Sequence, residues 1–195
     1  MKRSPSADGS ARAYLTLVPP LDDCVHELDL AVGDVVVYAS HGLGRVEARV
    51  GGAGDPRELV VLTFDSGLRV TLPLDRALDA LRAPSGELEL EDVQRTLRGT
   101  PAPRIAPWAA RFRSMREKVA AGEATGLAEV VRDCAGRERQ TVDAGGGQAA
   151  GATGERGLYL QARKLLAAEI AYTRGIDAAQ ADAWTVAQTS AQPSE

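Results

Sequence analysis

The chain has 195 residues, enough for one mid-sized domain or two small ones, and its hydrophobic content of 44% can support a core. The formal net charge of −4 excludes nucleic-acid binding driven by overall electrostatic attraction. Any DNA contact must therefore use a local basic patch or be held in place by another protein.

The sequence gives no sign of a membrane or metal protein. No run approaches the roughly 20 apolar residues that span a bilayer, and residues 1–13 contain no apolar core, so we expect neither a membrane segment nor a signal peptide. Cys24 and Cys134 lie far apart, without companions at metal-ligand spacing. We interpret them as reduced thiols, which suits a cytoplasmic protein that carries no metal or cofactor.

In the N-terminal half of the chain, the pattern of apolar and polar residues changes near residue 28. Residues 1–27 show no sustained periodicity and are predicted to form a flexible extension. From residue 32 to 73, apolar and polar residues alternate, which predicts strands. Asp65-Ser66-Gly67 is a hairpin-turn signal, and 51–56 makes a looser connection. Four or five short strands predict a small Tudor- or SH3-like β-barrel in a domain of residues 28–84.

After Pro84 the apolar spacing becomes helical, so an all-α domain over 85–190 follows the barrel and gives an α+β fold. Five glycines in 141–154 predict a mobile loop, with its unusual glycine-rich part at 145–154. Gly175 is expected to end one helix, and Asp177 to cap the next. The predicted helices cover residues 87–98, 108–120, a segment around 127–134, residues 155–174, and a final segment that carries Trp184.

Neither the glycine pair nor the histidines indicate an enzyme. Gly42-x-Gly44 lacks the third glycine, the following helix and the acidic residue of a dinucleotide site, so we interpret both glycines as turn residues. His26 and His41 have no cluster of partners at ligand spacing, and no Ser/His/Asp or paired-carboxylate motif stands out. We expect a protein without catalytic activity.

Trp108 has two interpretations. Trp108, Phe112, Met115 and Val119 follow each other at i, i+4, i+7 and i+11, which would make Trp108 the first member of a core stripe. Trp108 also opens its helix, and residues 104–118 hold five cations and one anion, a local charge of +4. An aromatic residue beside such a patch can wedge against a base while the cations hold phosphates. A solvated helix face would explain the same charges.

Several motifs carry a family resemblance. The first are Gly33-Asp34-x-Val36-Val37-Tyr38-x-x-His41-Gly42-x-Gly44 and Val70-x-Leu72-Pro73. The others are Trp108-x-x-Arg111-Phe112-Arg113, Ala128-Glu129-Val130-Val131-Arg132-Asp133 and Ala162-Arg163-x-Leu165-Leu166-x-x-Glu169-Ile170-Ala171. The first group resembles the RNA polymerase interacting domain that the CarD/CdnL family of bacterial transcription factors shares with the transcription-repair coupling factor. The second resembles the family's helical domain.

The resemblance implies a regulator of transcription initiation that docks on the polymerase β subunit and stabilises the open promoter complex. Trp108 would be a minor-groove wedge at the upstream edge of the bubble, and the DNA-contacting cations would be Arg104, Arg111 and Arg113. The residues expected to contact polymerase are Arg49, Arg57, Arg69 and Thr71. No heptad seam demands a dimer, and we expect a cytoplasmic monomer associated with the nucleoid through polymerase.

Some positions depart from the family pattern. Thr71 stands where relatives often carry a basic residue, Ala39 replaces a usual proline, Ala110 stands where some relatives carry a cation, and the hairpin at 51–56 is shorter and less basic. These changes bear on polymerase contact more than on the fold. An alternative is therefore a divergent protein-only interaction module with Trp108 in its core. Target promoters, the direction of regulation and the role of the extension stay open.

Overall fold

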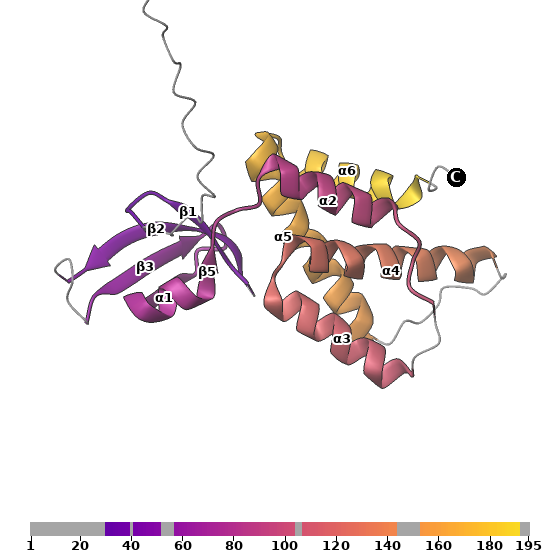
Figure 1. Ribbon diagram of the computed structural model, residues 1–195, viewed down its shortest axis with the longest axis horizontal. Coiled ribbons are helices and arrows are strands. Elements are labelled where there is room, and N and C mark those ends of the chain that lie inside the picture. Colours follow the sequence, from indigo (N-terminus) through magenta and orange to yellow (C-terminus); the bar gives the residue numbers. More distant parts are fainter. Residues whose placement is uncertain (1–29, 40, 52–56, 104–106, 144–152, 192–195) are drawn as a thin grey trace, which may run out of the picture.

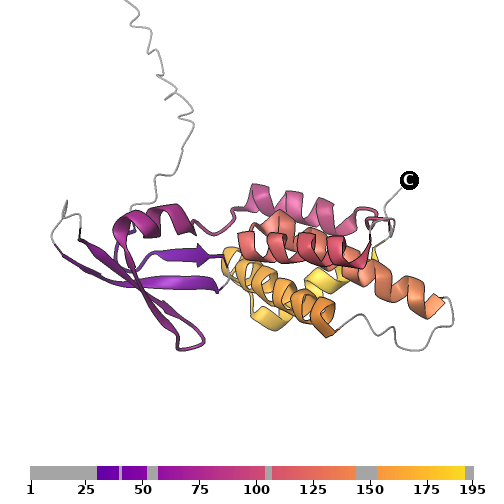
Figure 2. The same cartoon turned by 90° about the horizontal axis from the view of Figure 1, so that it is seen from below.

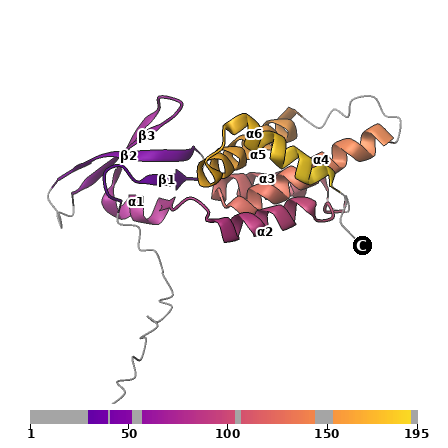
Figure 3. The same cartoon turned by 90° about the horizontal axis from the view of Figure 1, so that it is seen from above.

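The computed structural model describes residues 30–39, 41–51, 57–103, 107–143 and 153–191. Within them, an antiparallel sheet with one short helix is followed by a group of longer helices, which confirms the α+β fold (Figure 1). Views along the other directions show the sheet at one end of the long axis and helices α2–α6 at the other (Figures 2 and 3). No helix in the described ranges is long and apolar enough to cross a bilayer.

The sheet has the strand order β4-β3-β2-β1-β5, and every described pairing is antiparallel. Valine, leucine and phenylalanine side chains on its concave side form one core with Leu30 and Ala77. This curled sheet is the small barrel-like unit that the alternating pattern predicts. The strands are β1 (Val35–Tyr38), β2 (Gly42–Val50), β3 (Leu59–Phe64), β4 (Arg69–Pro73) and β5 (Leu81–Arg82).

A β-bulge interrupts the alternation of β2. Val46 pairs with Leu62 and Ala48 pairs with Val61, so Glu47 is the extra residue. A bulge bends its strand and moves the following side chains out of register with the core. Val50 is accordingly exposed, although the alternating pattern places it on the same face as buried Val46.

The two glycines of Gly42-x-Gly44 have different roles, so their interpretation as a pair of turn residues is wrong for one of them. Gly42 closes the β1–β2 turn with φ +81°, a conformation that favours glycine. Gly44 lies inside β2, between Val36 and Phe64. A Cβ at Gly44 would approach Phe64 Cε1 to 2.8 Å, so this glycine makes room for the phenylalanine ring.

The helices agree closely with the apolar spacing, apart from the end of α4, the start of α5 and the additional helix α1. Helix α4 continues to Asp143, α5 begins at Thr153, and residues 144–152 of the predicted loop lie outside the described residues. The pattern missed α1, because seven residues give too few periodic positions, and missed the two-residue strand β5. The helices are α1 (Leu74–Ala80), α2 (Glu87–Arg98), α3 (Trp108–Ala121), α4 (Ala124–Asp143), α5 (Thr153–Arg174) and α6 (Ala178–Ser190).

The helices pack around a second core of leucine, valine, alanine and isoleucine side chains from α2, α3, α4, α5 and α6. The predicted junction between α5 and α6 is confirmed. Gly175 has φ +62° after α5, and Asp177 caps α6 by accepting a hydrogen bond from the Gln180 N–H at 2.7 Å. Two cores, one under the sheet and one among the helices, therefore support the molecule.

Candidate nucleic-acid and protein interface

Trp108 is half exposed at the start of α3. Its side chain is 48% exposed, whereas Met115 and Val119 of the same stripe are buried. The indole stacks on Phe112, with ring centroids 5.2 Å apart and an interplanar angle of 14°. Offset stacking restricts the indole without covering its outer face. In Figure 1 this end of α3 is the end farther from the sheet.

The cations of α3 divide into two groups. Arg111 points to α5, where its Nη2 lies 3.8 Å from Glu155 Oε1, and the two side chains are only 19% and 10% exposed. Lys118 pairs with Glu129 at 2.6 Å. Arg113 and Arg116 are exposed and form no ion pair within the described part of the chain.

The positive charge that α3 presents to solvent is therefore smaller than its sequence suggests. Arg113 and Arg116 are directed outward, whereas the charge of Arg111 is opposed by the carboxylate of Glu155 in a largely buried contact. Arg104 lies outside the described residues. Of the cations predicted to contact DNA, Arg113 is the one that the structure places at the surface, near the N-terminal half of the helix.

The predicted polymerase contacts Arg69 and Thr71 lie on β4, at one edge of the sheet. Both side chains are exposed. Arg69 Nη2 lies 2.7 Å from Glu47 Oε1, and the hydroxyl of Thr63 donates to the other oxygen of Glu47. The bulged residue Glu47 thus joins β2, β3 and β4 on the face away from the core.

Arg49 and Arg57, the other predicted polymerase contacts, lie elsewhere. Arg49 donates to Glu58 Oε1 at 2.6 Å, and the Glu58 side chain is 3% exposed. Burial of a carboxylate is unfavourable unless a cation accompanies it, so Arg49 has a structural task. Arg57 is exposed beside the start of β3. The structure therefore brings Arg69 and Thr71 together, but it does not gather all four residues into one surface.

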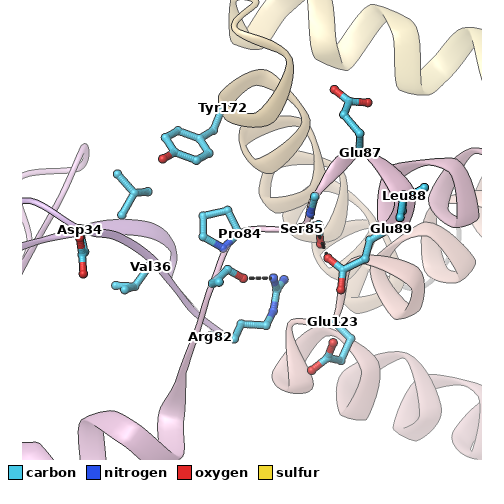
Figure 4. Close-up of a pocket in the computed structure, with 13 residues that line it drawn as sticks. Asp34, Val36, Arg82, Pro84, Ser85, Glu87, Leu88, Glu89, Glu123 and Tyr172 are labelled. Carbon is cyan, nitrogen blue, oxygen red and sulfur yellow. Dashed lines mark hydrogen bonds between the residues drawn. The ribbon is translucent and has the colours of Figure 1, made fainter. Parts of the chain in front are cut away.

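A cleft with a volume of about 890 Å³ lies between the sheet and the helices (Figure 4). Pro84 and Ser85 of the connecting segment cross it, and Tyr172 of α5 lies on its helical side. Its acidic residues come from three separate segments, as Asp34, Glu87 and Glu123 show. Within the described ranges, no three His, Cys, Asp or Glu side chains gather in a way that could hold a metal ion.

Comparison with protein families gives two matches in chain order. Residues 30–83 match the CarD-like/TRCF RID domain, and residues 92–185 match the CarD C-terminal domain. These matches cover 54 and 94 of the 195 residues, about three quarters of the chain, and correspond to the sheet and to the helices from α2 to α6. The chain belongs to the CarD/CdnL family. It is thus a member of a family of transcription regulators, and the resemblance of its motifs is confirmed.

A curated relative supports the membership in the CarD/CdnL family. The chain is 28% identical over 106 residues to the candidate transcription factor YdeB of Bacillus subtilis (strain 168). The aligned part covers 52% of this chain and 69% of YdeB. The RID domain, which the sheet matches, is an RNA polymerase interacting domain.

In this CarD/CdnL member, the sequence reasoning missed the acidic partners of the candidate cations. Glu47, Glu58 and Glu155 hold Arg69, Arg49 and Arg111, respectively. The hairpin register offered a signal for one pair, because Val50 opposite Leu59 brings Arg49 close to Glu58. Arg111 and Glu155 are on separate helices, and no local pattern relates them. The sequence therefore identified the cations but not which of them are neutralised.

Proposed function

We propose that this protein regulates transcription initiation in the cytoplasm, by binding the β subunit of RNA polymerase and stabilising the open promoter complex. The sheet would hold the polymerase, and the N-terminal end of α3 would meet DNA at the upstream edge of the bubble. The effect needs no chemical step, so the protein acts without enzymatic activity. The family membership supports the class of function, and the geometry of Trp108 supports the mechanism.

The polymerase contact is proposed for the β4 side of the sheet. An edge strand offers backbone N–H and C=O groups that a strand of another protein can pair with, while exposed side chains give specificity. Arg69 and Thr71 lie on that edge and are the favoured contacts. Arg57 could contribute from beside β3, and Arg49 would first have to leave Glu58.

The single observation that carries the DNA contact is the half-exposed indole of Trp108 at the tip of a helix. Stacking on Phe112 holds the indole in place before DNA arrives, which lowers the entropy lost on binding. Inserting an aromatic or apolar side chain at a base step partly unstacks it, a known way to kink or hold open a duplex. Arg113 is placed to contact the phosphate backbone, and Arg104 stays a prediction.

A modest interaction is sufficient for this mechanism. Stacking between a base and an aromatic side chain contributes about 1–3 kcal/mol, and about 1.4 kcal/mol changes an equilibrium tenfold. Attachment to polymerase raises the local concentration of the indole at the promoter, so a chain with a net charge of −4 can still use a weak DNA contact.

The test is the lifetime of open promoter complexes with the wild type, Trp108→Ala and Trp184→Ala. The chain has two tryptophans, and Trp184 is partly buried against the helical core with the Arg174 guanidinium 4.2 Å from its ring centroid. Trp184→Ala is therefore a matched control for loss of an indole. We expect Trp108→Ala to shorten the lifetime by roughly tenfold, whereas Trp184→Ala lowers the melting temperature and keeps the lifetime.

Two outcomes would contradict the proposal. An unchanged lifetime with Trp108→Ala, in a system where the wild type lengthens it, would remove the wedge. A loss of stability of about 3–5 kcal/mol in Trp108→Ala would indicate a core tryptophan and a protein-only module. Binding of the isolated β-subunit lobe must be retained by Trp108→Ala, because the sheet is unchanged.

A further inference from the structure

The segment from Ala83 to Gly86 joins the sheet to the helices, between β5 and α2. Two folded units of one chain usually move relative to each other, unless their contact is large and apolar. In this protein polar residues from the sheet and from the helices surround the connecting segment, with Arg82 and Ser85 among them (Figure 4). The residues that fix the segment therefore determine how the sheet and the helices are oriented.

Glu169 of α5 is the central group of this contact. Its side chain is 2% exposed. Oε1 accepts from Arg82 Nη1 at 2.6 Å and from the Ser85 N–H at 2.7 Å, and Oε2 accepts from Arg82 Nη2 at 2.9 Å. Because Arg82 belongs to β5, this bidentate pair connects the sheet directly to the helical core.

The same arginine and the next turn of α5 extend the network. Arg82 Nη2 also donates to the carbonyl of Gly122, in the turn between α3 and α4, at 2.6 Å. Thr173, one helical turn after Glu169, donates its hydroxyl to the carbonyl of Ser85 at 2.7 Å. Residues four apart lie on one helix face, so α5 holds both polar backbone groups of Ser85. Burial lowers the pKa of Arg82 and the Glu169 hydrogen bond raises it, with a net increase, so the guanidinium stays charged.

Close backbone packing surrounds this network. A Cβ on Gly122 would lie 2.5 Å from the Cα of Ala39, and a Cβ on Gly42 would lie 2.9 Å from Leu165 Cδ2. Both glycines also have a positive φ, +68° and +81°. The β1–β2 turn therefore lies close to α5 and to the α3–α4 turn, and at Gly122 the backbone of Ala39 leaves no space for a side chain. This packing sets how closely the sheet approaches the helices, whereas the Arg82–Glu169 ion pair sets the angle between them.

We propose that Arg82 and Glu169 form a latch that holds the sheet and the helices in one orientation, and that this orientation is required for Trp108 to act on a polymerase-bound promoter. The second half of this statement rests on the proposed function. When two sites on one molecule engage a common target, the gain from tethering depends on a geometry that lets both bind together. Arg82 and Glu169 are positioning residues, since neither is on β4 or the exposed end of α3.

A buried ion pair suits such a task better than it suits general stability. Desolvation of both charges offsets much of their attraction, so buried pairs contribute little net stability, and their directional geometry can select one arrangement. The bidentate pair, with the additional bond from the Ser85 N–H, accepts one relative orientation of β5 and α5.

The orientation can be measured without polymerase. Spin labels at Ser66→Cys, in the β3–β4 turn, and Gln161→Cys, on the exposed side of α5, report the distance between sheet and helices by electron–electron double resonance. Cys24 is replaced by serine in the full chain. Cys134 is buried with a thiol pKa of about 11, so it stays unlabelled at neutral pH. We expect a single narrow distance distribution in the labelled chain without further substitutions. Adding Glu169→Gln or Arg82→Lys is expected to broaden or shift this distribution.

Asp182→Asn is the matched control. Asp182 pairs with Arg163 through both oxygens, and this arginine–carboxylate contact joins α5 to α6 within the helical part. Its loss is expected to lower the melting temperature and leave the distance narrow. An unchanged narrow distance in Glu169→Gln, with circular dichroism showing a folded chain, would overturn the latch. Equal broadening in Asp182→Asn would also overturn it, by pointing to general destabilisation.

The functional half is tested by the open-complex lifetime. Glu169→Gln is expected to keep its affinity for the β-subunit lobe and to shorten the lifetime roughly fivefold or more, the lower range of coupling between two sites. If Glu169→Gln broadens the distance distribution but keeps the wild-type lifetime, the orientation of the sheet and the helices is not required for the action of Trp108, and this half of the proposal is overturned. If the wild type itself does not lengthen the lifetime, the proposed function fails, and the distance measurement still decides whether the latch exists.

Discussion

The sheet edge and the N-terminal end of α3 present their candidate contacts in opposite ways. On the edge strand β4, Arg69 is paired with Glu47, and on the inner strand β2, Arg49 is paired with Glu58. On α3, Trp108 and Arg113 extend outward, and the cation drawn inward is Arg111. We infer from this difference that the two regions suit different partners. A neutralised strand edge suits recognition by shape and backbone pairing, whereas an exposed indole beside an arginine suits a nucleic acid.

The largest expected effect is on stability, at the N-terminal end of α3. Arg111→Ala would leave Glu155 nearly buried without its cation, a change that costs about 3 kcal/mol or more. Urea unfolding of this variant should show the loss, and Arg113→Ala, at an exposed position on the same helix, should stay within about 0.5 kcal/mol of the wild type. Wild-type stability in Arg111→Ala would make Arg111 available for DNA and remove the contrast between the two arginines.

A pH experiment tests how tightly α3 packs on α4. Burial raises the pKa of the Cys134 thiol from 9.0 to about 11, and the Arg137 guanidinium contacts both this sulfur and Met115 of α3. The unfolded chain releases this proton at lower pH than the folded chain, so the contribution is present below pH 9 and is lost as the pH rises toward 11. The loss should be roughly 2–3 kcal/mol.

Cys134→Ala isolates this contribution from other groups that titrate at high pH. The difference in unfolding free energy between wild type and variant should decrease between pH 9 and 11. A constant difference across that range would show that the thiol is hydrated in the folded protein, and hence that α3 does not close over α4.

Salt dependence distinguishes the two surfaces. If Arg113 and Arg116 contact phosphates, replacing both with alanine should lower the slope of log lifetime against log salt by about 2, one for each contact. Arg111→Ala should leave the slope unchanged, because its charge faces Glu155. Equal slopes for the wild type and the double variant would show that α3 carries no phosphate contact.

The smallest effect is expected at the sheet edge. Arg69→Ala removes an exposed pair with Glu47, and such pairs contribute about 0–1 kcal/mol. Stability should hardly change, and affinity for the β-subunit lobe should fall by no more than about fivefold. A much larger loss of affinity would show that Arg69 leaves Glu47 and binds polymerase through its charge, as Arg113 is proposed to bind DNA.

The sequence predicted the fold from periodicity, and it was least successful where contacts between distant segments decide. The spacing of Leu127, Val130 and Val131 is enough to place a helix, because one buried face repeats with a fixed period. The bulge at Glu47 and the strand role of Gly44 depend on a partner strand, which no local pattern reveals. The sequence missed the short elements α1 and β5 for the same reason, because packing and pairing with the rest of the sheet define them.

For the candidate site, the sequence identified residue types and their order, and the structure adds which charges are opposed. Trp108 could be selected from its place at the end of an apolar stripe, but whether it is buried depends on how α3 meets α5. Arg82 and Glu169 are 87 residues apart, and their pairing follows from the way β5 and α5 meet. The burial of Trp108 and the pairing of Arg82 with Glu169 both depend on the tertiary structure. The tertiary structure therefore decides which side chains are exposed to a partner.

The most direct measurement of the central claim is a 19F NMR experiment on fluorotryptophan at position 108, in a Trp184→Phe background with unlabelled polymerase and promoter DNA. One resonance then reports on the indole at the end of α3. A contact with an unstacked base step predicts a shift of this resonance when the open promoter complex forms, and no such shift with polymerase alone. An unshifted resonance in a verified open complex that contains the bound protein would contradict the account.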